Sequence, residues 1–325
     1  MMISRAIAAA AFLMLAADSA AAQSIASRVA AVRDGKVRMT FASRDDICGF
    51  NNGISTTSSN RTNNRSTWSG DRSEDVEYDV ECSEGPARVV VEKSAGRVTN
   101  VKAYVGGRWR ASSSATDLGA VSTKEATDWL LSLASSASSK VSGSAIFAMT
   151  LADSVRIAPS LARFAENDGN PEEARDQAIF WLGQLRGEST ELLRGLYTRL
   201  EREGLKDKVI FSLSQQRGVN DEWLLAIVSN PRESIEMRKK ALFWAGQTGA
   251  SMSRLSSLYS RLTEREMKDQ MIFVFSQRRE PAAIDKLMDI ARNDPDRETR
   301  RKALFWLGQS KDPRVATMLS DIINR

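Results

Sequence analysis

The sequence has no histidine and only two cysteines, Cys48 and Cys82, in 325 residues. The absence of histidine excludes Ser-His and Cys-His catalysis and nearly all histidine-based metal sites. The sequence also has no phosphate-binding loop, no glycine-rich dinucleotide motif and no calcium-binding loop. Pairing of the two cysteines would leave no thiolate for a nucleophile or a zinc site. These absences predict no cofactor, no metal ion and no enzyme of those classes.

Long apolar runs are absent too. The run from Ala6 to Ala17 follows Arg5 and precedes Ala20-Ala21-Ala22. A basic start, a short apolar core and an A-x-A site are typical of a signal peptide, so residues 1–22 are predicted as a leader ahead of Gln23. The run is shorter than the ~20 apolar residues that cross a bilayer. We therefore expect no stable membrane insertion, with an uncleaved anchor as the alternative.

Export would place Cys48 and Cys82 in an oxidising compartment. Two thiols have one intramolecular pairing available, so the sequence predicts a disulfide between them. A pair of free buried thiols is the alternative. The predicted location is the periplasm or the outside of the cell.

Neither sign of charge is in large excess. The net charge is +5, with 14 basic and 12 acidic residues from Gln23 to Leu118, and 31 and 28 from Gly119 onward. Neither part is the strongly basic body that is typical of nucleic-acid binding. We therefore expect no nucleic-acid partner.

The first part of the mature chain has the periodicity of strands. Polar and apolar residues alternate in segments 36–42 and 76–82, as in half-buried strands. Two further apolar runs, 87–92 and 97–105, are separated by a short Gly-containing turn and predict a β-hairpin. The sequence therefore predicts a small disulfide-bonded, β-rich domain over residues 23–118.

Helical periodicity replaces this pattern further along the chain. Residues 111–116, with the sequence ASSSAT, predict a linker. Ser122 is then predicted to cap a helix and Glu125 to complete a capping box. Residues 119–142 are predicted as a connecting helix and linker. Residues 143–325 are predicted as a separate helical array.

Self-similarity defines this array. Each copy has a basic residue, an Ile-Phe or Leu-Phe pair and a final glutamine: RDQAIFWLGQ (175–184), KDKVIFSLSQ (206–215), RKKALFWAGQ (238–247), KDQMIFVFSQ (268–277) and RRKALFWLGQ (300–309). The phenylalanines lie 31, 32, 30 and 32 residues apart, and a degenerate sixth copy contains Phe147. Another amphipathic stretch precedes each copy, so each unit predicts two short helices that stack on their neighbours to bury their apolar faces.

The copies resemble HEAT-like repeats of the short variety found in many bacterial proteins. The resemblance rests on Pro171 to Arg175 with Leu182-Gly183-Gln184, and on Pro295 to Arg300 with Leu307-Gly308-Gln309. It covers about residues 143–325 and implies an all-α solenoid behind the β-rich domain, an α+β multidomain chain. It says little about function, because members of the family bind diverse partners.

Every second copy differs. Ser212 and Val274 stand where the other copies have Trp181, Trp244 and Trp306. The unit is therefore either one hairpin or a double repeat of about 62 residues. We expect the tryptophans to pack between hairpins, because large aromatic residues are mostly buried. An exposed aromatic ladder for a peptide or a glycan is the alternative.

Two polar columns recur with the repeat. The basic column is expected to bond carboxylates and helix ends inside the stack, with a stripe for an acidic partner as the alternative; it comprises Arg175, Lys206, Arg238, Lys268 and Arg300. The glutamine column is expected to cap helices and to bond between repeats; it comprises Gln184, Gln215, Gln247, Gln277 and Gln309.

The sequence favours a non-catalytic scaffold that binds a protein or peptide through the solenoid. The most basic points are the first candidates for partner contact: Arg238, Lys239, Lys240, Arg300, Arg301 and Lys302. A purely structural envelope component is a further possibility.

A carboxylate-based glycan hydrolase is the enzymatic alternative. Its acid and base would come from the β-rich domain, with the solenoid as a platform. The candidate carboxylates are Asp45, Asp46, Asp75, Glu77, Asp79 and Glu81. Glu77, Asp79 and Glu81 occupy alternate positions of segment 76–82, so they more simply form the solvent-exposed face of a strand.

Overall fold

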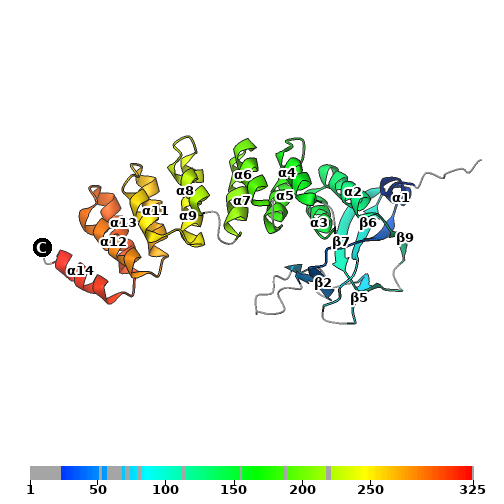
Figure 1. Ribbon diagram of the computed structural model, residues 1–325, viewed down its shortest axis with the longest axis horizontal. Helices are drawn as coiled ribbons and strands as arrows, with labels where there is room; N and C mark the ends of the chain where they lie inside the picture. Colours follow the sequence, from blue (N-terminus) through cyan, green and yellow to red (C-terminus); the bar gives the residue numbers. More distant parts are fainter. Residues whose placement is uncertain are drawn as a thin grey trace, which may run out of the picture.

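The computed structural model places a β-rich region at one end of the molecule and a row of helical hairpins that extends away from it to the C-terminus (Figure 1). It describes residues 23–50, 53–56, 68–69, 74–79, 82–111, 114–153, 156–185, 189–216 and 221–323. The predicted signal peptide, residues 1–22, lies outside the described residues. The predicted fold class, a disulfide-bonded β-rich region followed by stacked helices, is confirmed.

The main sheet has the strand order β7-β6-β1-β9. Its strands are β1 (Gly35–Phe41), β6 (Ala87–Ser94), β7 (Arg97–Val105) and β9 (Ala115–Ala120). The predicted hairpin is confirmed, because β6 and β7 pair antiparallel from Ala87↔Val105 to Ser94↔Arg97. Its turn residues Ala95 and Gly96 both have positive φ, 49° and 77°, as a two-residue turn with the twist of the flanking strands requires.

Two sequence expectations for this region were wrong. The segment predicted as a linker includes the start of β9, which pairs parallel with β1 from Lys36↔Ala115 onward. Of the residues predicted as a strand over 76–82, the structure describes 76–79 and 82, and among these Val76–Glu77 forms a strand, β5, which pairs with β8 (Arg108–Trp109). The ends of a strand depend on where its neighbouring strand ends, and strand periodicity alone does not show this.

A second small sheet carries the first cysteine. It contains β2 (Ile47–Phe50), β3 (Gly53–Thr56) and β4 (Trp68–Ser69) in that order. Cys48 on β2 is bonded to Cys82, with the Cα atoms 5.2 Å apart. The next residues, Gly49 and Ser83, exchange two backbone hydrogen bonds of 2.9 Å. The predicted disulfide is therefore confirmed, and it lies beside a short backbone bridge.

Two helices lead from the sheet to the stack, α2 (Thr123–Ser136) and α3 (Ser139–Thr150), and α1 (Ile25–Ala31) packs against α2. Ser122 caps α2, accepting a 3.1 Å hydrogen bond from the backbone N–H of Glu125. Glu125 does not complete a capping box, because its Oε1 accepts from the backbone N–H of Ile25 at 2.8 Å. Its carboxylate therefore satisfies a free N–H group at the start of α1.

Helical hairpins make up the remainder of the described chain. Their first helices, called the A helices here, are α4 (Ile157–Glu166), α6 (Ser189–Arg199), α8 (Asp221–Ser229), α10 (Met252–Tyr259), α12 (Pro281–Asn293) and α14 (Pro313–Ile323). The second helices, the B helices, are α5 (Glu172–Gln184), α7 (Glu203–Ser214), α9 (Ile235–Thr248), α11 (Arg265–Ser276) and α13 (Arg297–Gly308), with α3 packed before α5. Within the described ranges, no helix is both long and apolar enough to cross a membrane.

One apolar core runs through the sheet and the stack. It includes Val37 and Val91 of the sheet, Ile146 of α3 and Leu242 of α9, each fully buried, and it reaches Met318 of α14. Each B helix packs against the next, from α3 to α13. Neighbouring hairpins therefore share a continuous interior, as stacking of units that are too short to fold alone requires.

Candidate binding surface

The two members of the repeated Ile/Leu-Phe pair lie in different places, the Ile or Leu in the core and the Phe at the surface. Ile179, Ile210, Leu242 and Ile272 are fully buried. The phenylalanine that follows each of them is partly exposed, and Phe305 is 58% exposed. The phenylalanine therefore does not share the buried position of the residue before it. Consecutive helical positions are 100° apart, so one can point into the stack while the next lies at its surface.

The tryptophans extend this surface column into a row of aromatic rings. Each packs on the phenylalanine of the preceding B helix, with ring-centroid distances of 4.8 Å for Phe147–Trp181, 5.5 Å for Phe211–Trp244 and 5.3 Å for Phe273–Trp306. The expectation of buried tryptophans holds for Trp181, whereas Trp244 and Trp306 are partly exposed.

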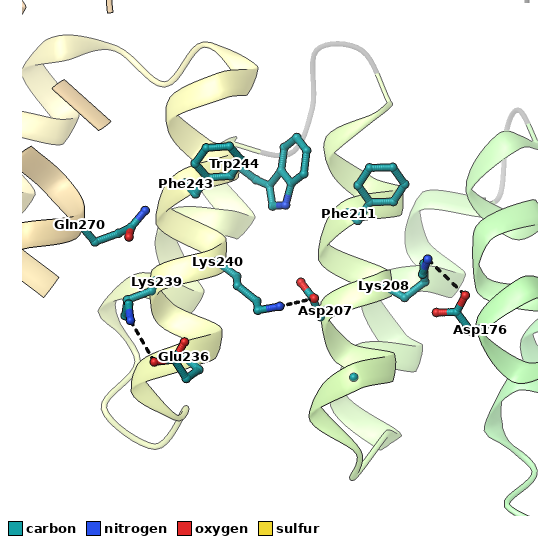
Figure 2. A pocket seen from close by; sticks show the side chains of 11 residues that line it. Asp176, Asp207, Lys208, Phe211, Glu236, Lys239, Lys240, Phe243, Trp244 and Gln270 are labelled. Carbon is teal, nitrogen blue, oxygen red and sulfur yellow. Dashed lines mark hydrogen bonds and ion pairs between the residues drawn. The ribbon is translucent and has the colours of Figure 1, made fainter. Parts of the chain in front are cut away.

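A charged row lies one helical turn before the aromatic row. Asp176 pairs with Lys208 of the next B helix at 3.2 Å, and Asp207 pairs in the same way with Lys240. Figure 2 shows both pairs below the rings of Phe211, Phe243 and Trp244. Burial raises the pKa of Asp269, and attraction by Lys302 opposes that rise.

A groove of about 710 Å³ lies across α7 and α9 where the two rows meet (Figure 2). Its apolar lining comes from Phe211, Phe243 and Trp244. Its charged lining balances, with three lysines and three carboxylates: Lys208, Lys239, Lys240, Asp176, Asp207 and Glu236. The groove therefore combines aromatic surface with equal numbers of positive and negative groups and has no excess of either charge.

The six basic residues proposed from the sequence occupy three different settings. Arg238 is 8% exposed; its Nε donates to the Val228 carbonyl at 2.9 Å and its Nη1 to Glu264 at 2.7 Å. Arg300 Nη1 donates to the Asp294 carbonyl at 2.7 Å. These two arginines tie helix ends together inside the stack.

The other four lie at the surface. Lys239 and Lys240 line the groove, and Lys239 pairs with Glu236 at 2.9 Å. Arg301 and Lys302 are exposed on α13, where Arg301 pairs with Glu298 at 2.9 Å. The structure therefore does not gather the six residues into one basic patch.

The rest of the basic column has the structural role expected of it. Arg175 is 3% exposed and its Nε donates to the Ala165 carbonyl at 2.7 Å. Lys206 lies 4.8 Å from the ring centroid of Tyr197, and Lys268 Nζ lies 3.0 Å from Asp294. Arginines thus reach backbone carbonyls in one set of copies, and lysines reach side chains in the alternate set.

Among the described residues, no side chain of the glutamine column makes the expected hydrogen bond between repeats. Gln215 and Gln277 donate to the serine hydroxyls beside them, at 3.1 and 3.2 Å. The bonds between repeats come from the next residues, because Gln216 Nε2 donates to the Gly183 carbonyl at 3.2 Å and Arg278 Nη1 to the Gly246 carbonyl at 2.8 Å. The sequence contains a signal for these two residues, because 216 and 278 lie 62 positions apart, which is the length of the double repeat.

The carboxylates of the β-rich region are largely engaged by cations. Asp75 is 1% exposed and lies 2.6 Å from Lys36 Nζ. Glu77 and Asp79 lie 2.6 and 3.3 Å from the same guanidinium, that of Arg108. Asp46 pairs with Arg44 at 2.9 Å, and Asp45 is exposed. Glu81 lies outside the described residues.

No family model matches this chain, and no curated protein matches its sequence.

Proposed function

We propose that this protein is an exported, non-catalytic scaffold of the HEAT-like kind that holds a protein or peptide partner on the aromatic surface of its B helices. The observation that carries the proposal is the row of partly exposed Phe and Trp rings across successive B helices, next to the 710 Å³ groove. A few residues supply most of the affinity in protein interfaces, and aromatic side chains are enriched in the buried centres of those interfaces. Here they are held in place by the packing of the helices below them.

An extended segment of the partner suits this surface. Packed helices lie ~8 to 10 Å apart, and an extended chain rises ~3.3 Å per residue. Every third residue of such a segment would therefore meet the ring of the next B helix. Because the lysines of the groove already face Asp176, Asp207 and Glu236, apolar contact rather than net charge would supply the affinity.

Export is the second element of the proposal. The predicted leader at residues 1–22 and the Cys48–Cys82 disulfide both support a periplasmic or secreted location. N-terminal sequencing of the protein from its native cells should begin at Gln23. A mature chain that begins at Met1 would contradict export by cleavage.

Affinity capture from a cell-envelope extract tests the binding site. Wild-type protein, Phe243→Ser and Leu225→Ser would be used as baits, and partners identified by mass spectrometry. Leu225 is a matched control because it is partly buried in a separate groove of about 490 Å³ lined by α8 and α10. The captured partner, once purified, should bind Phe243→Ser about tenfold or more weakly and Leu225→Ser normally.

Equal capture by all three baits would remove the aromatic surface from the proposal. Capture of no partner by the wild-type chain would favour the purely structural role. The glycan hydrolase stays a prediction without geometric support, since Glu77 and Asp79 share one arginine instead of flanking an open site.

A further inference from the structure

The last B helix of the described stack, α13, has a face that its counterparts bury. Phe305 is 58% exposed. Among the described residues, nothing lies within 4 Å of a Cβ added at Gly308. At the equivalent glycines the same Cβ would lie 2.7 Å from Ser212 and 2.5 Å from Val274. A residue of the next B helix thus packs against Gly183 and Gly246, whereas no described residue packs against Gly308.

The two closed interfaces show what fits against this face. In both, the next B helix, α7 or α11, places a small residue against the glycine. In both, a polar side chain four residues further along donates to the glycine carbonyl, from Gln216 at 3.2 Å and from Arg278 at 2.8 Å. Beside Gly246, the ring of Phe243 stacks on Phe273 of α11 at 6.3 Å.

We propose that the face of α13 formed by Phe305 and Gly308 is a docking site for an amphipathic helix of a partner molecule, built like α7 and α11. The chain makes the equivalent interface twice, between α5 and α7 and between α9 and α11. These two interfaces show which residues fit against such a face. The partner helix carries an aromatic ring for Phe305, a small residue directly after that ring for Gly308, and a hydrogen-bond donor four residues beyond the small residue. Burial of the exposed ring supplies the main driving force.

Charge adds a further requirement. Asp176 pairs at 3.2 Å with Lys208 of α7, which stands three residues before the ring of Phe211. The position of Asp176 is taken in α13 by Arg301, whose pair with Glu298 is largely exposed. An exposed pair of this kind is worth little and is readily exchanged. The partner helix therefore carries an acidic residue three positions before its ring.

A peptide copied from α11 tests the proposal directly. The probe is residues 264–279 (EREMKDQMIFVFSQRR), labelled with fluorescein, in its natural form and with Gln270→Glu, Gln270→Lys or Phe273→Ser. Fluorescence anisotropy with the full chain should show saturable binding. The affinity should rise several-fold with Gln270→Glu, fall with Gln270→Lys and be lost with Phe273→Ser.

Matched variants of the protein locate the binding. Gly308→Leu would fill the space that the small residue needs and should weaken binding about tenfold or more. It should not lower the unfolding midpoint of the free chain, because the added side chain meets no described atom. Ala226→Leu places the same side chain at an exposed position of α8 and should leave binding unchanged.

Three results would overturn the proposal. The first is no saturation at about 1 mM peptide. The second is equal affinity for wild-type chain and Gly308→Leu. The third is dimerisation of the wild-type chain that Gly308→Leu abolishes, which would assign the face to a second copy. Phe243→Ser should bind the peptide normally, so failure here is separate from failure of the proposed function.

Discussion

Gly246 of α9 lies directly against Val274 of α11, so closely that a Cβ on Gly246 would be 2.5 Å from Val274 Cγ1. Gly183 and Ser212 have the same relationship one double repeat earlier. A tryptophan at position 212 or 274 could not be accommodated there. The glycine of one copy therefore requires a small residue in the next, which explains why tryptophan occurs only in alternate copies and supports a double repeat as the structural unit.

Gly246→Ala should destabilise the protein although alanine favours helix. The new methyl group would overlap Val274, and overpacking of this kind costs about 1 to 3 kcal/mol. Gly308→Ala is the matched control, because the same methyl group meets open space there and should be neutral or slightly stabilising. Urea unfolding of the two variants measures the difference. Equal midpoints would contradict the close contact.

Leu242→Ala should cost far more stability than Phe243→Ala, although phenylalanine is the larger residue. Leu242 is fully buried, and such truncations cost about 2 to 5 kcal/mol. Phe243 is partly exposed, so its truncation should cost about 1 to 2 kcal/mol. Chemical denaturation of both variants checks this order. The reverse order would place Phe243 in the core.

Glu264 should make stability depend on pH in acid. The hydrogen bond from Arg238 lowers the pKa of Glu264 from 4.5 to about 2. A carboxylate with a depressed pKa in the folded state stabilises the protein fully above its unfolded pKa, and the contribution is lost as the pH falls through the folded pKa. The stability difference between wild type and Glu264→Gln should therefore be constant above pH 5 and shrink from about pH 4.5 to pH 2.

Urea unfolding of both chains across this pH range supplies the measurement. Because the Glu264 side chain is 41% exposed, solvent weakens the pair and only the direction of the change is predicted. A difference between the two chains that stays constant down to pH 2 would show that the pair with Arg238 does not form in solution.

Reduction of the Cys48–Cys82 disulfide should destabilise the β-rich region. The bond joins residues 34 apart in sequence, and closing a loop of that length stabilises by about 3 to 4 kcal/mol in the chain-entropy account. Unfolding with and without dithiothreitol, followed by near-ultraviolet circular dichroism, measures the loss. The double variant Cys48→Ser/Cys82→Ser should unfold like the reduced protein and should not respond to the reductant.

Repetition made the helical stack predictable. Five copies of one pattern, about 31 residues apart, located the B helices, because an error in one copy is corrected by the others. The structural role of the basic column followed from the same alignment and holds for Arg175 and Arg238, which are buried. The β-hairpin was predictable for a local reason, since its two strands are separated by only Ala95 and Gly96.

The surface was harder to predict than the fold. Phe243 and Leu242 are adjacent and both apolar, so composition does not say which one faces the core; packing with the next hairpin decides it. Strand β9 pairs with β1, about 80 residues away in sequence. The residues of β9 themselves do not indicate which distant strand they pair with. Gln216 and Arg278 were missed because they differ in residue type, although both donate to a glycine carbonyl.

Site-specific photocrosslinking in the native envelope would show whether the B-helix surface contacts a partner. A benzophenone side chain would replace Phe243 in the aromatic row or, in a second chain, Leu225 in the α8–α10 groove. We predict that position 243 crosslinks to one protein partner and that position 225 does not. Crosslinking to that partner from position 225 alone, or from neither position, would contradict the proposal that the B-helix surface holds it.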